Sequence, residues 1–467
     1  MAYLSTRYAS ASAESSLAPS SGAAIPRGWF ASASSSADVR GPIMTVDVEV
    51  GAPIPDLHPA QLADGTTFVA VQVLVRLHGH PIGMLLLPQS DADPTSGAID
   101  RRFVAVRIWA ELGEAITAHL YKDGIAAPTK LTMAGLPHGG LAPCTWQATL
   151  GSSRPAATVC IATCGSSIPL LLRTVRSALQ QTYDNTQVLV VDNRPGATAL
   201  PGPLVDAFSH EDRLWYVTES RPGLANVRNR SVREAETEIV ALTDDDVALD
   251  PDWLGFLVAG FDRPEVACVT GLILPSQLET RAQLLIEEFG GFSKGFERRR
   301  WDLDRHRLNH PLYPYLFGMY GSGANAAWRR SVLEEIGGYD ARFGSGTRTR
   351  GGEDLDIYLT CIRSRHQLVY EPAALVRHEH RRELERLRQQ VFDYGVGLGA
   401  VLTKRFLQRE ERSEMVARLP AGLDYLLNPS SPKNAGKTKI FPRSLTLIEL
   451  AGIAYGPITY LRSRRYL

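Results

Sequence analysis

The chain has 467 residues, with 50 lysines and arginines balanced by 50 aspartates and glutamates, so its formal net charge at pH 7 is zero. This balance excludes the strongly basic surface that most nucleic-acid-binding proteins need, and we expect no nucleic-acid partner. With 44% hydrophobic residues, the chain is long enough for roughly two or three domains with complete cores.

The cysteines point to a reducing compartment. There are five, an odd number at irregular spacing, as is typical of free thiols in the cytosol. Cys160 and Cys164 form a pair without a second pair elsewhere, so they predict no zinc site. No uninterrupted apolar run reaches the length of about eighteen residues that a membrane-spanning helix needs. We therefore expect a cytoplasmic protein.

The first 43 residues are rich in serine and alanine and have no periodicity, which predicts a disordered tail. Three arginines and few acids leave open a transit peptide. Met44 leaves open a later start of translation, in which case the tail is not part of the protein.

Residues 44–150 are predicted to form a small α/β accessory domain. Residues 67–77 and 82–87 are typical of two strands, and 103–120 has helical spacing of its apolar residues. The turn between the strands holds His78 and His80, which we interpret as exposed turn residues rather than ligands. Residues 137–156 are rich in glycine and proline and predict a linker.

Strands and helices alternate from residue 157 onwards. Short apolar runs predict strands at 158–162, 188–191, 214–217 and 239–242. This alternation is typical of a mostly parallel sheet with right-handed crossovers. Because parallel strands end at the same edge, Thr163, Asp192 and Asp244–Asp246 are expected to lie together there.

Three adjacent aspartates, Asp244–Asp246, end the fourth predicted strand. Such carboxylates repel one another, and Mg²⁺ or Mn²⁺, which take oxygen ligands, would relieve that repulsion. The alternative is a solvated acidic turn before a helix that begins at Pro251, with Asp250 as its N-cap. The motif alone leaves both interpretations open.

An ordered series of motifs over roughly half the chain favours the metal-binding interpretation of these aspartates. It comprises Asp192-Asn193, Arg221-Pro222-Gly223-Leu224-Ala225, Arg228-Asn229, Thr243-Asp244-Asp245-Asp246, Gly323-Ala324-Asn325, Trp328-Arg329-Arg330, Gly337-Gly338-Tyr339-Asp340, Gly352-Glu353-Asp354 and His378. Residues 157 to about 380 closely resemble the family 2 glycosyltransferases. The resemblance implies a GT-A fold, a Rossmann-like and mostly parallel α/β sheet, in a catalytic domain that we place at 151–382.

The resemblance implies a metal-dependent reaction with a nucleotide-diphosphate sugar as donor. By the family's Asp-x-Asp motif, Asp244 and Asp246 would bind Mn²⁺ or Mg²⁺, and His378 would lie near the metal or the diphosphate. A metal held by carboxylates stabilises the leaving diphosphate as a Lewis acid. The alternative for His378 is a polar residue at the end of a strand.

The acceptor hydroxyl must lose a proton, and the resemblance assigns this to the Glu-Asp motif. Asp354 would be the base of an inverting enzyme, with Glu353 beside it. Residues 344–352, with four glycines and two arginines, are typical of a functional loop. The alternative is that Glu353 and Asp354 are ordinary first-turn acids that favour the helix dipole.

Binding of the nucleotide is the third requirement. As the family uses it, Asp192 would accept a hydrogen bond from the base, and Thr163 would flank the nucleotide. Asp244 and Asp245 would face the nucleotide as well.

Two arginines are further candidates. Arg221 or Arg228 would reach the nucleotide or its phosphates, and the alternative for Arg228 is an exposed helix cation.

Residues 383–467 are predicted to be helical. No Gln-x-x-Arg-Trp motif follows, which favours single-sugar transfer over polymerisation. At 445–467 an apolar segment is followed by arginines, which indicates either peripheral contact with an anionic membrane or a buried helix with a basic end.

We therefore expect an inverting, metal-dependent glycosyltransferase acting on a glycan or lipid-linked acceptor, cytoplasmic or on the inner face of the plasma membrane. One alternative is a catalytically inactive nucleotide-sugar-binding scaffold protein. Another is a nucleotidyltransferase, against which the loop after the first strand, Thr163–Ser167, has no basic residue.

Overall fold

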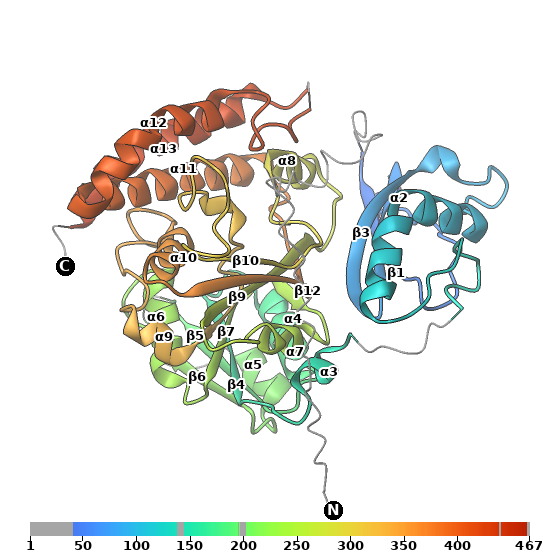
Figure 1. Cartoon of the computed structure of the whole chain (residues 1–467), viewed down its shortest axis with the longest axis horizontal. Helices are drawn as coiled ribbons and strands as arrows, with labels where there is room; N and C mark the ends of the chain where they lie inside the picture. The colour runs from blue at the N-terminus through green and yellow to red at the C-terminus, as the bar shows by residue number, and fades with distance from the viewer. Residues whose placement is uncertain (1–40, 138–143, 195, 197–201, 439, 465–467) are drawn as a thin grey trace, which may run out of the picture.

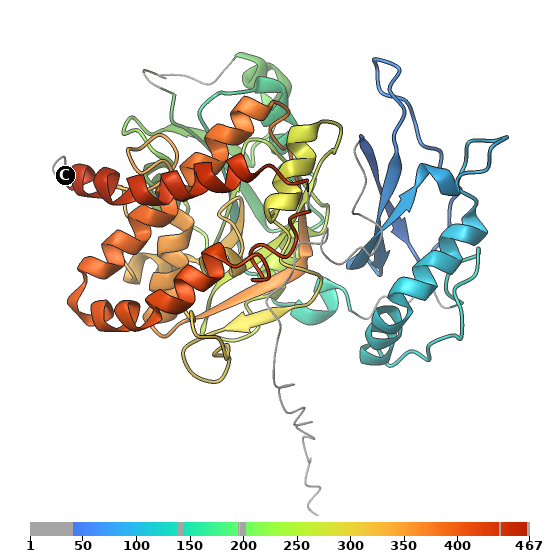
Figure 2. The same cartoon turned by 90° about the horizontal axis from the view of Figure 1, so that it is seen from above.

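The computed structural model describes residues 41–137, 144–194, 196, 202–438 and 440–464. The predicted tail at 1–43 therefore lies almost entirely outside the described residues, as does Arg465 near the C-terminus. Figure 1 shows a sheet-containing central part, a separate unit formed by the N-terminal third, and a group of helices formed by the C-terminal end. The accessory unit lies beside the central part in both views (Figures 1 and 2).

The N-terminal unit is a three-stranded sheet in the order β1-β2-β3, covered by one long helix. Its elements are β1 (Ile43–Glu49), β2 (Ala70–Leu77), β3 (His80–Pro88), the short 3-10 turn η2 (Gln89–Asp91) and α2 (Arg101–Lys122). Strand β2 is buried along almost its whole length because β1 and β3 flank it and α2 packs against the sheet. The two turn histidines, His78 and His80, are half-buried, so the expectation that both are exposed was wrong.

This unit contacts the central part directly. The backbone N–H of Ile43 donates to the carbonyl of Leu278 at 2.7 Å. Arg76 forms an ion pair with Asp250 at 2.5 Å, and Arg377 pairs with Asp47. Ile43, Ala70 and Leu86 also pack in one apolar cluster with Leu278 and Leu284, so the accessory unit contacts the larger domain through both apolar and charged side chains.

The central part is a nine-stranded sheet in the order β10-β12-β9-β11-β7-β4-β5-β6, with β8 paired to β12. The strands are β4 (Ala157–Thr163), β5 (Thr186–Asp192), β6 (Leu214–Thr218), β7 (Ile239–Asp244), β8 (Val247–Leu249), β9 (Val266–Pro275), β10 (Arg299–Trp301), β11 (Asn325–Arg329) and β12 (Gln367–His378). All four predicted strands are present. They form three parallel pairs, β4 with β5, β4 with β7, and β5 with β6. The other half is mixed, because β11 is antiparallel to both β7 and β9.

Helices cover both faces of this sheet, which is why its strands are continuous apolar runs rather than alternating ones. One face packs against α4 (Ile168–Leu179) and α7 (Trp253–Ala259), and the other against α6 (Leu224–Glu234) and α10 (Glu353–Arg363). The shorter helices are α3 (Trp146–Leu150), α5 (Gly202–Phe208), α8 (Arg281–Phe289), α9 (Arg330–Glu335) and the 3-10 turn η3 (Phe317–Met319).

The C-terminal part consists of three long helices, gathered on one side of the molecule in both views (Figures 1 and 2). They are α11 (Leu384–Leu407), α12 (Arg409–Leu427) and α13 (Arg443–Ser463). Glycines allow α11 and α13 to pack closely: a Cβ on Gly399 would lie 2.2 Å from the carbonyl oxygen of Ile453. Within the described residues, α13 is the single helix whose length and composition would allow it to span a membrane, and 33% of its most apolar stretch is buried in the structure.

Candidate active site

A large cavity of about 1760 Å³ opens at the carboxyl edge of the parallel strands. Its walls come from the ends of β4 and β7, the segment after β12, the start of α10, and helices α11 to α13. Of the predicted site residues, those on the wall are Thr163, Arg228, Asp244, Asp245, Asp246, Glu353, Asp354 and His378. The structure thus brings most of the candidates into one cavity.

The three aspartates have different surroundings. Asp244 is the last residue of β7 and lies 3.7 Å from the guanidinium of Arg228. Asp245 accepts a hydrogen bond of 2.5 Å from the hydroxyl of Thr163, at the end of the neighbouring strand β4. Asp246 is buried, and the pairing of β8 with β12 brings it next to His378.

Burial makes negative charge unfavourable on all three carboxylates. Burial raises the pKa of Asp244 and Asp246 above the ordinary aspartate range. Burial also raises the pKa of Asp245 to about 6, although the hydrogen bond from Thr163 opposes this. The carboxylates also raise one another's pKa, and a bound cation would favour their ionised forms.

The residues at Asp246 fit a divalent metal. Among the described residues, the buried Oδ1 of Asp246 has no hydrogen-bond partner, and a buried acceptor without one is costly. The Nε2 atom of His378 lies 3.5 Å from that oxygen. Because Mg²⁺ and Mn²⁺ sites are often completed by substrate phosphates, one or two carboxylates and an imidazole are a sufficient protein contribution.

A second histidine orients His378. The Nδ1 atoms of His378 and His380 are 3.0 Å apart, and His380 Nε2 lies 2.8 Å from a carboxylate oxygen of Glu287. If His380 donates Nε2–H to Glu287, its Nδ1 accepts from His378, which leaves the Nε2 lone pair of His378 facing Asp246. Burial lowers the pKa of His378 to about 3, so the ring is neutral, as a metal ligand requires.

Arg228 lies between the two acidic groups of the cavity. It is buried, and its guanidinium forms an ion pair of 3.0 Å with Glu353 and faces Asp244 from the other side. It also lies 5.4 Å from the ring centre of Tyr339. The alternative of an exposed helix cation is therefore wrong, because Arg228 lies on the face of α6 that points into the site.

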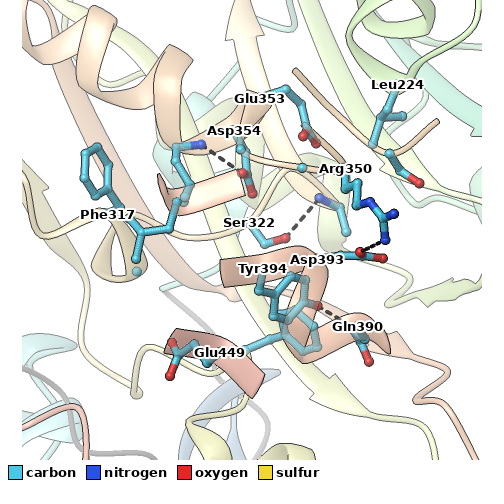
Figure 3. A pocket seen from close by; sticks show the side chains of 18 of the residues that line it. Leu224, Phe317, Ser322, Arg350, Glu353, Asp354, Gln390, Asp393, Tyr394 and Glu449 are labelled. Atoms are coloured by element: carbon cyan, nitrogen blue, oxygen red, sulfur yellow. Dashed lines mark hydrogen bonds and ion pairs between the residues drawn. The ribbon is translucent and has the colours of Figure 1, made fainter. Parts of the chain in front are cut away.

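Glu353 and Asp354 differ although they are neighbours at the start of α10. Glu353 is buried against Arg228, and burial raises its pKa to about 7. Asp354 is half-buried, and its Oδ2 accepts the backbone N–H of Gly323 at 3.2 Å. Figure 3 shows both side chains on the cavity wall. Of the two, Asp354 is the more accessible to an acceptor in the cavity.

Two predicted nucleotide contacts do not line the cavity. The carboxylate of Asp192 is buried and binds the guanidinium of Arg194 at 2.6 Å and the hydroxyl of Tyr216 at 2.5 Å. Arg221 pairs with Glu219 at 2.9 Å outside the cavity wall. The residue after Asp192, Asn193, lines the cavity instead.

Several cavity residues were not predicted. Lys294 lies on the wall, and burial lowers its pKa to about 8. Arg350 forms an ion pair with Asp393 at 2.9 Å, which links the loop before α10 to α11 (Figure 3). No pattern in the sequence indicates Lys294. His380, by contrast, could have been predicted from its spacing, because residues i and i+2 of an extended chain lie on the same side and His378 is two residues before it.

Replacing Arg228 with methionine is expected to destabilise the protein by about 3–5 kcal/mol, because Glu353 would be left buried without its partner. The free energy of unfolding in urea measures this loss. The double variant Arg228→Met/Glu353→Gln is expected to recover part of it, since the unpaired carboxylate is then gone. A double variant no more stable than Arg228→Met would contradict this account.

Comparison with known proteins gives the family. Residues 158–337 match the family model described as glycosyl transferase family 2. This region is similar to the family 2 glycosyltransferases. The predicted resemblance is confirmed, and with it the α/β class and the GT-A fold of that family.

Family 2 relatives cover only part of the chain. The pre-mycofactocin glycosyltransferase of Mycobacterium tuberculosis is 29% identical over 198 residues, which are 42% of this chain and 38% of that protein. A glucosyl-dolichyl phosphate glucuronosyltransferase of Haloferax volcanii is 26% identical over 45% of this chain and 66% of its own length. An O-antigen chain rhamnosyltransferase of Salmonella typhimurium is 28% identical over 50% of this chain and 68% of its own.

Among solved structures, a mannosyltransferase of Pyrobaculum calidifontis in complex with GDP-Man and Mn²⁺ aligns with a TM-score of 0.41 and 19% identity, over 66% of this chain and 88% of that one.

Proposed function

We propose that this protein is an inverting, metal-dependent glycosyltransferase that moves one sugar from a nucleotide-diphosphate donor to a hydroxyl acceptor. The observation that carries the proposal is the buried Oδ1 of Asp246, which has no hydrogen-bond partner in the described part of the chain and faces the Nε2 of His378 in the same cavity as Asp354. A metal bound there would act as a Lewis acid on the leaving diphosphate. Mn²⁺ suits the imidazole of His378 better than Mg²⁺, and both suit the carboxylates.

The chain's own residues supply the rest of the chemistry. Asp354 takes the proton of the acceptor hydroxyl, whose oxygen bonds to the anomeric carbon as the bond from that carbon to the phosphate oxygen breaks. The backbone N–H of Gly323 orients the carboxylate of Asp354. Attack from the side opposite the diphosphate inverts the configuration of the sugar.

The donor is identified by calorimetric titration with UDP, GDP, dTDP and CMP, each with Mn²⁺ and with EDTA. Binding of one nucleoside diphosphate that requires the metal supports the proposal and gives the donor class. Absence of binding for all four contradicts it. Metal-dependent binding with neither transfer nor hydrolysis of the matching nucleotide sugar would favour the inactive scaffold instead.

An apolar part of the cavity supports a lipid-linked acceptor. Away from the aspartates part of the wall is apolar, with Leu312, Leu316, Phe317, Met415, Leu419 and Leu423, although Arg418, Lys433 and Glu449 also line the cavity. Two of them, Leu419 and Leu423, also belong to a stripe on the outer face of α12 with Val416 and Leu427, at spacing that keeps one face of a helix. All four side chains of this stripe are between 49% and 59% exposed.

We infer that the stripe on α12 contacts the inner face of the plasma membrane and that the acceptor enters the cavity from the lipid. A helix that lies in the interface with exposed apolar side chains on one face buries those side chains among the lipid chains. The names of two relatives, which refer to glucosyl-dolichyl phosphate and to the O-antigen chain, are consistent with a lipid-linked or envelope glycan as acceptor.

The full chain is expected to float with vesicles of mixed zwitterionic and anionic lipid, and the variant Leu419→Glu/Leu423→Glu to lose most of that binding. Two charges in the stripe would have to enter the apolar part of the bilayer. The control is Val106→Glu, which adds one charge at a slightly more exposed apolar side chain on α2 of the accessory unit and should leave flotation unchanged. Equal flotation of wild type and double variant would exclude α12 as the contact.

A further inference from the structure

Four potential metal ligands converge in the accessory unit, outside the region that matches the family. They are His78 in the turn between β2 and β3, His119 in the last turn of α2, Asp123 directly after α2, and Cys144 just before α3. One ligand atom from each lies within 4.8 Å of the other three. The cluster therefore joins three segments that are far apart in the sequence.

Four of the distances within this cluster are close to the edges of a tetrahedron around a metal, although the one between Asp123 and His78 is slightly shorter. Asp123 Oδ2 lies 3.1 Å from His78 Nδ1 and 3.3 Å from His119 Nε2. Cys144 Sγ lies 3.3 Å from His119 Nε2 and 3.4 Å from His78 Nδ1. Zinc bonds of about 2.0–2.3 Å in tetrahedral geometry place neighbouring ligand atoms about 3.3–3.7 Å apart.

A hydrogen-bonded network, in which both imidazoles and the Cys144 thiol donate to the Asp123 carboxylate, is the alternative to a bound cation. Each of the two histidine nitrogens faces both the Asp123 oxygen and the Cys144 sulfur. A nitrogen of a neutral imidazole carries at most one proton, which can point at the oxygen or at the sulfur but not at both in good geometry. One cation between the four atoms interacts favourably with all of them at once.

The surrounding structure holds the ligands in place. His78 has a left-handed backbone with φ of 54°, which is uncommon for a residue other than glycine. The carboxylate of Glu49 accepts the backbone N–H groups of His78 and Gly79 at 3.2 and 3.0 Å and so supports this turn. His80 contacts the backbone carbonyl of Cys144 at 2.7 Å through Nε2, which fixes the linker beside the turn.

We propose that His78, His119, Asp123 and Cys144 bind one zinc ion. A thiolate and two imidazoles select zinc over the Mg²⁺ or Mn²⁺ expected at Asp246. Four protein ligands close the coordination sphere, and the side chains of His78 and Asp123 are only 3% and 7% exposed, which is typical of a structural rather than a catalytic site.

The zinc would tie the accessory unit to the glycosyltransferase domain. Two residues after Cys144, the fully buried Trp146 donates its indole N–H to Asp252 at 3.1 Å. Trp146 also packs on the backbone of α7, where a Cβ on Gly255 would lie 2.4 Å from the indole ring. A metal that binds Cys144 together with His78 and His119 would therefore fix the chain two residues before Trp146, where the contact with α7 begins. The proposal is independent of the proposed glycosyl transfer.

Metal analysis of the full-length protein, purified without chelator, is the direct test. We expect one zinc per wild-type chain, and close to none in Cys144→Ser and in His119→Gln. The controls His58→Asn, which alters an exposed histidine of the accessory unit outside the ligand set, and Asp246→Asn, which alters the cavity, should keep one zinc each. A zinc-free wild type that takes up none from added zinc chloride, or variants that keep a full equivalent, would overturn the site.

Cobalt substitution tests the ligands without relying on how the variants fold. Wild-type protein with Co²⁺ in place of zinc should show the intense visible bands of a tetrahedral site together with a thiolate-to-metal charge-transfer band. Cys164→Ser, which removes the one exposed thiol among the five cysteines, should keep both signals. A wild-type spectrum of weak octahedral bands without charge transfer would rule out coordination by Cys144.

Discussion

The variant Asp354→Asn is expected to lose transfer by about 10²–10⁴-fold while it still binds the nucleoside diphosphate with metal. The asparagine keeps the shape of the side chain but cannot take the proton of the acceptor hydroxyl, and general base catalysis contributes about this factor. The backbone N–H groups of Gly323 and Leu355 donate to different oxygens of Asp354, so the single amide oxygen of asparagine keeps only one of these two contacts. The measurements are kcat with the identified donor and calorimetric affinity for its diphosphate.

Asp393→Asn is the matched control for that change. Asp393 lines the same cavity from α11 and pairs with Arg350, so the variant removes an equivalent charge a short way from the proposed base. We expect its kcat to fall much less than that of Asp354→Asn. Near wild-type kcat in Asp354→Asn would show that another group takes the proton, and equal losses in the two variants would show that the effect is not specific to the base.

The variant Asp246→Asn is expected to weaken Mn²⁺ binding by at least about 100-fold, which exceeds the effect of altering a residue that only supports a metal ligand. It replaces the one carboxylate of the three whose buried oxygen has no hydrogen-bond partner among the described residues, so no other contact of that atom compensates for the loss. Diphosphate affinity should fall to the value that the wild type shows in EDTA. Both affinities come from calorimetry, so the test does not depend on turnover.

Glu379→Gln controls for loss of negative charge near the metal. Glu379 lines the cavity next to His378, but its carboxylate pairs with Arg173 at 3.3 Å and also binds Gln277. We expect Mn²⁺ affinity within a few-fold of wild type. If Asp246→Asn bound Mn²⁺ as tightly as Glu379→Gln, the metal would have to be held by other groups of the cavity.

The sequence was sufficient for the parts of the fold that depend on local pattern. Strands β4, β5 and β7 are buried on both faces, so each is a continuous apolar run that ends where the polar edge begins, whereas β6 at the end of the sheet is half-buried. Because parallel strands end at the same edge of the sheet, the sequence was enough to predict that Thr163 and the three aspartates lie together. The contact between Thr163 and Asp245 follows from the parallel pairing of β4 with β7.

Features that depend on long-range packing could not be predicted. Whether Arg228 is exposed depends on α10 lying against α6, and nothing in the local sequence of α6 shows this. The carboxylate of Asp192 forms an ion pair with Arg194 and accepts a hydrogen bond from Tyr216, and the first of these contacts depends on the conformation of one loop. The cluster around Cys144 joins residues whose separation in sequence is as large as 66, and no spacing rule connects them.

The pairing of β8 with β12 has a consequence for the proposed metal site. Val247 and His378 face each other in that ladder, so Asp246 and His378 are placed by main-chain hydrogen bonds that every side chain at neighbouring positions can support. A slip of one residue would turn His378 to the opposite face of the sheet. The relative position of Asp246 and His378 therefore depends on the register of this ladder, whereas the apolar side chains of α12 lie outside the sheet and do not depend on it.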